Sequence, residues 1–311
     1  QNFNKLNPAA YKNFYDTYDQ MISDIYTMDP EKLEAGEDIE IMPLMQAYKT
    51  LLVEGFESAD IEIILSNIAM RLNKTPQTPH TVKDFGLQNA SFKGSMSGAQ
   101  QDRATLDFSY TLKGIDVGLK QFEEEFGGET PQEIVPENIS FGMSFEDLPI
   151  ITMLDKAMAI MQEAGDDSQA AERLLKQRYP EFISALADAD AKIKINDTYV
   201  GNNVWLVLVN GVGRMSPQAA MQVEGETEVR FYGMDYLMKI LDQRIKNPDT
   251  APAVSMMLQQ YVQGLGMMQM FGQQKKDDNG RDFRGYTITL TPEGNVQMNG
   301  TDMTQMMGMM R

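Results

Sequence analysis

Cysteine is absent from this 311-residue chain, and histidine occurs once, at His80. The lack of cysteine excludes disulfides, thiolate metal sites and a cysteine nucleophile. His80 lies in a proline-bracketed connection, where the neighbouring sequence supplies neither the nucleophile nor the orienting carboxylate that a histidine general base needs. We therefore interpret His80 as a surface or structural residue. We expect a non-enzymatic protein with no catalytic residue, no cofactor and no assigned metal site.

Positive charge is scarce as well. The chain has 45 Asp and Glu residues against 27 Lys and Arg residues, which gives a net charge of −18. Clustered cations bind phosphate groups and anionic lipid surfaces, so we expect no nucleic-acid partner and no electrostatic docking on anionic membranes. No stretch approaches the roughly 20 apolar residues of a membrane-spanning helix. The chain begins at Gln1, so we expect that a signal peptide or membrane anchor N-terminal to it has been removed, and a chain boundary chosen for other reasons fits as well.

Two short segments superficially resemble functional motifs. Gly94–Gly98 contains two serines, but they do not occupy the position of the nucleophile in Gly-x-Ser-x-Gly, and we predict a hairpin turn. Asp277–Asp282 is acidic, but it lacks the spacing and the closing glutamate of an EF-hand loop. We predict a solvated turn for this segment.

The first half of the chain has helical and then strand-like periodicity. An aromatic and aliphatic stripe with helical spacing predicts a helix over Tyr11–Ile25, and a second helix is predicted over Pro43–Glu54. Apolar residues then alternate with polar ones, which predicts three long strands over Ser58–Leu72, Asp84–Ser95 and Ala104–Val117. The acidic, glycine- and proline-bearing span 120–138 is a predicted exposed excursion or domain boundary.

The second half repeats this order of elements, without convincing similarity between the residues. We predict a strand at Ile139–Phe145, helices at Leu148–Glu163 and Ser168–Ala187 (the latter broken by Pro180), strands at Ala191–Val200, Asn203–Asn210 and Ala219–Phe231, helices at Met234–Lys246 and Ala251–Phe271, and a hairpin of Tyr286–Leu290 with Val296–Met298. The run Val204–Val209 is apolar on both faces, so we expect an interior strand that is covered on both sides.

Separate runs of helices and strands favour an α+β fold with long curved antiparallel sheets and amphipathic helices packed on one face. The repeated order of elements suggests a pseudo-duplication. We predict two segments, 1–130 and 131–311, which together form two domains or one continuous domain.

Methionine is abundant: 11 of the 25 methionines lie between Met256 and Met310. Its flexible thioether side chain packs against varied apolar partners. Helical stripes predict an apolar groove that accepts a ligand, and its candidate residues are Ile151, Leu154, Met158, Met234, Met238, Leu241, Met257, Leu258 and Leu265. The same stripes also fit plain core packing. Thioethers bind Cu(I), so chelate-like spacing at Met268 and Met270 and at Met303–Met310 makes copper handling a third interpretation.

The last quarter of the chain resembles a known family. A helical segment rich in Met, Gln and Gly, Gln259–Phe271, precedes Tyr286–Gly300, a strand and turn that end in Asn-Gly, and then a methionine-rich tail, Thr301–Met310. This pattern resembles the C-terminal end of the YdgA-like family and related envelope proteins of Gram-negative bacteria. The resemblance implies a protein that is exported or anchored in the inner membrane and faces the periplasm. It also implies an architecture like that of tubular lipid-binding or AsmA-like proteins, with no catalytic residues to transfer.

The first functional hypothesis is therefore a periplasmic protein that binds or transfers lipid or another apolar ligand in an apolar groove. The alternative is a structural or partner-binding envelope protein whose stripes pack its core or a homodimer interface. Cu(I) handling by methionine is the third.

Overall fold

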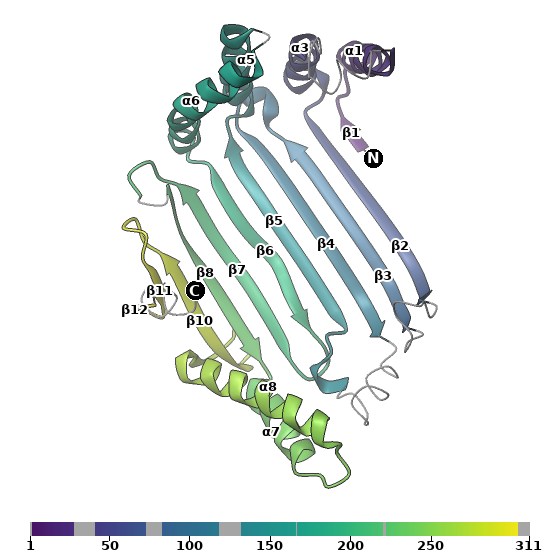
Figure 1. Ribbon diagram of the computed structural model, residues 1–311, viewed down its shortest axis with the longest axis vertical. Coiled ribbons are helices and arrows are strands. Elements are labelled where there is room, and N and C mark those ends of the chain that lie inside the picture. Colours follow the sequence, from purple (N-terminus) through teal and green to yellow (C-terminus); the bar gives the residue numbers. More distant parts are fainter. Residues whose placement is uncertain are drawn as a thin grey trace.

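The computed structural model describes residues 2–27, 41–72, 83–117, 132–165, 167–219 and 222–303. Within these ranges, twelve strands form one antiparallel sheet (Figure 1). The strand order follows the chain from β1 to β8 and continues through β10, β11 and β12, while β9 pairs with β10. The sheet is thus an open meander, which confirms the predicted α+β class.

The long strands follow one another in runs, and pairs of helices separate the runs. The strands are β1 Asn2–Asn4, β2 Ser58–Leu72, β3 Lys83–Ser97, β4 Ala104–Val117, β5 Asn138–Leu148, β6 Lys192–Gly201, β7 Leu206–Met215, β8 Val223–Tyr232, β9 Gln273–Lys276, β10 Asp282–Leu290, β11 Val296–Met298 and β12 Thr301–Asp302. The helices are α1 Pro8–Thr27, α3 Met42–Thr50 with a π-helical turn at Leu51–Gly55, α5 Ile150–Ala164, α6 Ser168–Asp188, α7 Met234–Ile245 and α8 Pro252–Phe271.

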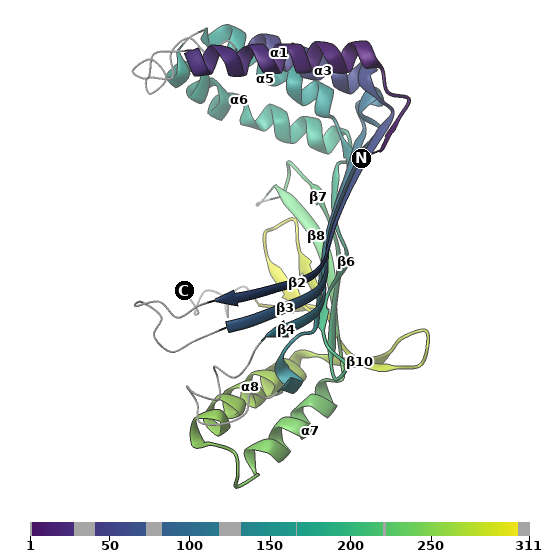
Figure 2. The same ribbon diagram turned by 90° about the vertical axis from the view of Figure 1, so that its right-hand side faces the viewer.

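The helices form two separate layers. Figure 2 shows α1, α3, α5 and α6 at one end of the sheet and α7 and α8 at the other, with both layers projecting from the same, concave side. The molecule therefore resembles a trough whose floor is the sheet and whose end walls are helical. Strands from both predicted segments share this floor, because β4 pairs with β5.

Strand alternation makes the two faces of the sheet chemically different. Ile63, Phe92, Tyr110 and Phe141 lie directly opposite one another on β2, β3, β4 and β5. Directly opposite residues in antiparallel strands point to the same face. The neighbouring positions carry polar residues such as Asp107, which accepts a hydrogen bond from the Ser95 hydroxyl at 2.9 Å. The concave face is thus mainly apolar and the convex face mainly polar.

Left-handed residues interrupt the long ladders. The pairing of β2 with β3 passes from Ser66–Asn89 to Ile68–Leu87, and Asn67, between them, has a φ of 55°. In the next ladder Gly114 has a φ of 63° at the corresponding break. The pairing register is the same on both sides of each break, so neither strand gains a residue. Figure 2 shows that β2, β3 and β4 turn toward the concave side.

Two details of the sequence prediction are wrong. The helix predicted to break at Pro180 continues through it as α6. Pro180 and Lys176 are exposed, so water can solvate the Lys176 carbonyl that loses its intrahelical donor. Strand β7 is interior, between β6 and β8, but its residues are half-buried or exposed because both helical layers lie on the concave side. Leu206 and Leu208 point to the convex face, which no described helix covers.

Candidate apolar ligand site

An apolar hollow lies between α5, α6 and the concave face of the sheet. Its volume is about 580 Å³, within the usual range of roughly 300–1,000 Å³ for small-molecule sites. The lining residues are Leu106, Phe145, Leu148, Ile150, Met153, Leu154, Ala157, Phe182, Leu186, Ala191, Lys192, Ile193 and Met215. We call this hollow the α5–α6 cavity.

Helical and strand periodicity both contribute to the cavity wall. Ile150, Leu154 and Ala157 recur at intervals of four and three along α5, so they share one side of that helix. Phe182 and Leu186 are four residues apart on α6. The floor residues come from four neighbouring strands: Leu106 of β4, Phe145 and Leu148 of β5, Lys192 and Ile193 of β6, and Met215 of β7. Each wall is therefore an ordinary amphipathic face, and the space between them is left unfilled.

A side chain from a distant turn anchors the start of α5. Asp102, in the connection between β3 and β4, accepts hydrogen bonds from the backbone N–H groups of Ile151 at 2.7 Å and Thr152 at 3.2 Å. The Thr152 hydroxyl also donates to this carboxylate. Helix α5 has no side-chain cap of its own at Pro149. Asp102 therefore satisfies amide groups that would otherwise lack an acceptor.

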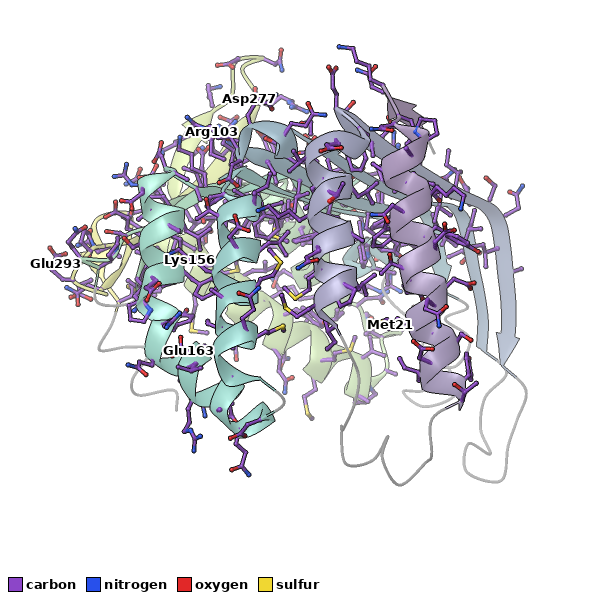
Figure 3. All side chains as sticks on the ribbon, turned by 90° about the horizontal axis from the view of Figure 1, so that it is seen from above. Met21, Arg103, Lys156, Glu163, Asp277 and Glu293 are labelled. Carbon is purple, nitrogen blue, oxygen red and sulfur yellow. The ribbon has the colours of Figure 1, made fainter. Side chains whose placement is uncertain are left out.

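Ion pairs hold the helical layer together. Viewed from above, α6, α5, α3 and α1 lie side by side (Figure 3). Lys156 of α5 pairs with Glu181 of α6 at 3.3 Å, and Glu163 of α5 pairs with Arg178 of α6. On the other side of α5, Asp155 pairs with Lys49 of α3 at 2.5 Å. These partly exposed pairs fix the helix positions more than they stabilise the fold, since exposed ion pairs are each worth only about 0–1 kcal/mol.

Charge is confined to the cavity rim. Lys192 is the single ionisable residue that lines the α5–α6 cavity, and its amino group pairs with the Asp190 carboxylate at 2.7 Å. The hydrogen bond and the charge of Asp190 raise the pKa of Lys192, and Lys192 in turn lowers the pKa of Asp190. Both groups stay ionised and paired at neutral pH. The interior of the cavity therefore suits a hydrocarbon group.

The apolar surface continues beyond the cavity onto the open floor. The ring of Phe145, which lines the cavity, meets the ring of Phe108 edge to face, with 6.4 Å between their centroids. From Phe108 an apolar surface extends across β5, β4, β3 and β2, with side chains 38% to 55% exposed. Its members are Phe141, Tyr110, Phe108, Phe92, Ile63 and Leu65. We call this surface the floor band. Large exposed apolar patches mark ligand or partner sites more often than chance.

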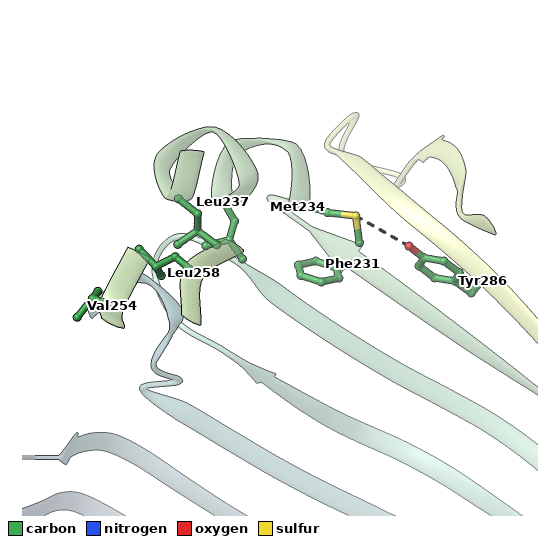
Figure 4. Packing of buried hydrophobic residues seen from close by; sticks show 7 residues of the cluster. Phe231, Met234, Leu237, Val254, Leu258 and Tyr286 are labelled. Carbon is green, nitrogen blue, oxygen red and sulfur yellow. Dashed lines mark hydrogen bonds between the residues drawn. The ribbon is translucent and has the colours of Figure 1, made fainter. Parts of the chain in front are cut away.

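The structure separates the nine predicted groove residues into two groups. Leu154 lines the α5–α6 cavity, and on the same helix Ile151 is half-buried and Met158 is buried. Met234, Leu241 and Leu258 are no more than 2% exposed and belong to the core cluster between α7, α8 and the sheet (Figure 4).

The other three residues, Met238, Met257 and Leu265, pack against this cluster. Tyr286 closes it from the sheet, and its hydroxyl donates to the Met268 carbonyl at 2.9 Å. Helices α7 and α8 bury their stripes against each other and against the sheet. Leu241 and Leu258 are thus packing residues in this structure, and we move the proposed site to the α5–α6 cavity.

Sequence reasoning missed two parts of the site. Phe182 and Leu186 were within a predicted helix, but no stripe was assigned to them. The floor band was visible as period-two alternation on strands 58–72 and 104–117, which normally indicates core positions. A sequence does not show which core-like face remains uncovered.

The two segments that superficially resemble functional motifs belong to strand ends and turns. The turn after β3 starts at Gly98, whose φ is 73°, while the serines before it belong to the strand. Asp277 accepts hydrogen bonds from the backbone N–H groups of Asn279 and Arg281, both at 2.9 Å, which confirms a turn at the tip of β9 and β10. His80 and residues 304–311 lie outside the described ranges.

Metal-binding clusters and membrane-spanning helices are both absent from the described residues. No group of three or more His, Cys, Asp or Glu side chains among them is placed to hold a metal ion. None of their helices is both long and apolar enough to cross a membrane. Comparison of the chain with protein-family models, curated proteins and solved structures found no match.

Proposed function

We propose that this protein binds an elongated apolar ligand, such as the acyl chain of a lipid, and holds it without chemical conversion. The observation that supports this is the continuous apolar surface that leads from Leu154 and Phe145 inside the α5–α6 cavity through Phe108 onto the floor band. A compact ligand would need the cavity alone. A chain longer than the cavity would extend along the floor band.

The energetics are sufficient for useful affinity. An acyl chain of about sixteen carbons, buried at roughly 0.8 kcal/mol per methylene, contributes on the order of 13 kcal/mol. The loss of translational and rotational freedom offsets at least about 4 kcal/mol, and incomplete burial on the open floor band offsets more. We therefore expect a Kd in the micromolar range, which corresponds to about 8 kcal/mol.

The place of action belongs to the same proposal. The resemblance of the C-terminal segment to the YdgA-like family supports a role in the periplasm of a Gram-negative cell, where such a protein would carry or present lipid. Fractionation of cells that express the full gene tests this part. Recovery of the protein in the cytoplasm would contradict it and leave the binding proposal intact.

The binding test compares two variants of α5. Ala157 lines the α5–α6 cavity, whereas Ala159 on the same helix is exposed. In Ala157→Trp the indole should displace two or three ligand methylenes and weaken binding of a fluorescent fatty acid by about 15- to 60-fold. Ala159→Trp should bind as the unmodified protein does. Equal affinity of the two variants would exclude the α5–α6 cavity as the site.

A second comparison tests the floor band. Phe108→Ser leaves the cavity lining unchanged and removes a half-exposed ring beside it. We expect weaker binding of chains of about sixteen carbons and little change for chains of about eight, which fit inside the cavity. Mass spectrometry of solvent extracts should find lipid in the purified protein. No extracted lipid together with no uptake of the fluorescent probe would contradict the proposed function.

A further inference from the structure

The positive groups that border the α5–α6 cavity are already paired within the chain. Lys192 is the only cation among the thirteen described residues that line the cavity, and the other twelve are apolar. Its amino group lies 2.7 Å from the Asp190 carboxylate. Helix α5 starts at the lining residue Ile150, and the Asp102 carboxylate accepts hydrogen bonds from the amide groups of its first turn. A lipid carboxylate or phosphate would have to displace one of these two carboxylates to gain a charged hydrogen bond here.

Two arginines near the rim are paired as well. Arg214 directly precedes the lining residue Met215, and its guanidinium group pairs with Glu224 at 2.6 Å. Arg103 pairs with Asp147 of β5 at 2.8 Å. The chain as a whole carries a net charge of −18, and the field of this charge repels an approaching anion. Neither the rim nor the long-range field therefore favours a negatively charged head group.

We propose that the α5–α6 cavity takes lipids whose polar end is uncharged, such as acylglycerols, and that Asp190 sets this preference by neutralising Lys192. This inference rests on the proposed binding of an acyl chain and adds the class of head group. The floor band, along which a long chain would extend, consists of aromatic and aliphatic residues, so it supplies no cation either. The whole path of the ligand therefore lacks a free counter-ion for an acidic lipid.

Asp190 is well placed to exclude an anion from Lys192. A single residue separates the two in the chain, so Asp190 competes for the ammonium group at a high effective concentration. An anionic head group that replaced it would leave the Asp190 carboxylate without its partner, and the exchange would gain little. An acylglycerol keeps the pair intact, because its ester and hydroxyl groups need no counter-ion and can stay hydrated beside the rim.

A matched pair of ligands tests the head-group preference. A monoacylglycerol and the lysophosphatidic acid with the same acyl chain differ only by one phosphate group. Titration calorimetry of the natural chain, with both ligands below their critical micelle concentrations, should give a Kd that is at least about fivefold lower for the monoacylglycerol. This preference should decrease as the ionic strength rises, because salt screens the repulsion between the phosphate and the acidic protein.

Substitution of Asp190 tests the residue that sets the preference. Asp190 has a φ of 56°, a conformation that asparagine tolerates, so Asp190→Asn removes the charge without adding backbone strain. The freed Lys192 ammonium group can then pair with phosphate, and the ratio of the lysophosphatidic acid Kd to the monoacylglycerol Kd should fall by about three- to tenfold. Glu172→Gln is the control, because it removes the same charge and frees the exposed Lys176 of α6. Its Kd ratio should change by less than about twofold.

The outcomes separate this inference from the binding proposal. Equal or tighter binding of the lysophosphatidic acid to the natural chain would overturn the inference and leave acyl-chain binding in place. So would equal Kd ratios in Asp190→Asn and Glu172→Gln. If neither ligand bound, the proposed function would be wrong, and this inference would be wrong with it.

Discussion

The connection between Asp102 and α5 allows a quantitative test of how the α5–α6 cavity is built. The Asp102 carboxylate accepts from two backbone N–H groups of the first turn of α5 and from the Thr152 hydroxyl. Its backbone has a φ of 54°, in the left-handed region. Substitution of this residue therefore changes both the cap and the backbone strain, and three variants separate the two effects.

The expected free-energy changes follow from these contacts. Asp102→Gly removes the cap, which costs about 1–2 kcal/mol, and a favourable charge at the helix N-terminus, which costs about 0.5 kcal/mol. Asp102→Ala should lose about 1 kcal/mol more, because a Cβ disfavours the left-handed region. Asp102→Asn keeps one oxygen acceptor and tolerates that region, so it should lose about 1 kcal/mol. The expected order of stability is Asp, Asn, Gly, Ala.

Hydrogen exchange measures this loss locally. A cost of about 2 kcal/mol should accelerate exchange in the first turns of α5 by roughly 30-fold when opening limits exchange. Asp167, which accepts from the backbone N–H groups of Gln169 and Ala170, caps α6 in the same way. Asp167→Ala should accelerate exchange in α6 and not in α5. If Asp102→Gly changed exchange in α5 by less than twofold, the distant cap would not be what holds this helix.

Three further predictions concern other parts of the fold. Leu258→Ala should destabilise the protein by about 2–5 kcal/mol in urea unfolding, because Leu258 is fully buried, and should leave fatty-acid affinity unchanged. Met256→Ala, on the exposed side of α8, is the control for stability. A loss of fatty-acid affinity in Leu258→Ala would place the ligand between α7 and α8 instead. Pro180→Ala should slow exchange in α6 by restoring a donor, and faster exchange would contradict our account of this helix. Hydrogen bonds from the Arg281 backbone and side chain lower the pKa of Asp277. The Asp277 carboxylate therefore stabilises the turn at neutral pH, and this stabilisation is lost as the pH falls through the lowered pKa. The chemical shift of the Arg281 amide in NMR should titrate with a midpoint below that of an ordinary aspartate, and the same titration in Asp277→Asn would assign it to another group.

Several elements could be predicted because their signal is local. The period-two alternation of 58–72 and 104–117 predicts β2 and β4 with the observed ends. The aromatic stripe from Tyr11 to Ile25 lies within α1. Periodicity is a property of neighbouring residues, so it can be recognised without knowledge of what the element packs against.

The candidate site could be predicted only in part, because a stripe does not identify its partner. Leu154 and Leu258 occur in equally convincing helical stripes. Leu258 is buried because α7 and α8 pack on each other and on the sheet, whereas Leu154 borders a space that α5 and α6 leave unfilled. Three-dimensional packing decides between these outcomes, and residues far apart in the chain determine that packing.

The lack of cysteine excludes thiol chemistry, and the excess of acidic residues predicts that nucleic acid is not a partner. The alternating periods were enough to indicate long antiparallel strands and amphipathic helices. The α5–α6 cavity and the floor band could not be inferred in this way. Each depends on where one element stops covering another: α5 and α6 leave a space over Phe145 that their side chains do not fill. Whether a helix covers a given face of the sheet depends on segments that are far apart in the chain, so it is decided only when the chain folds.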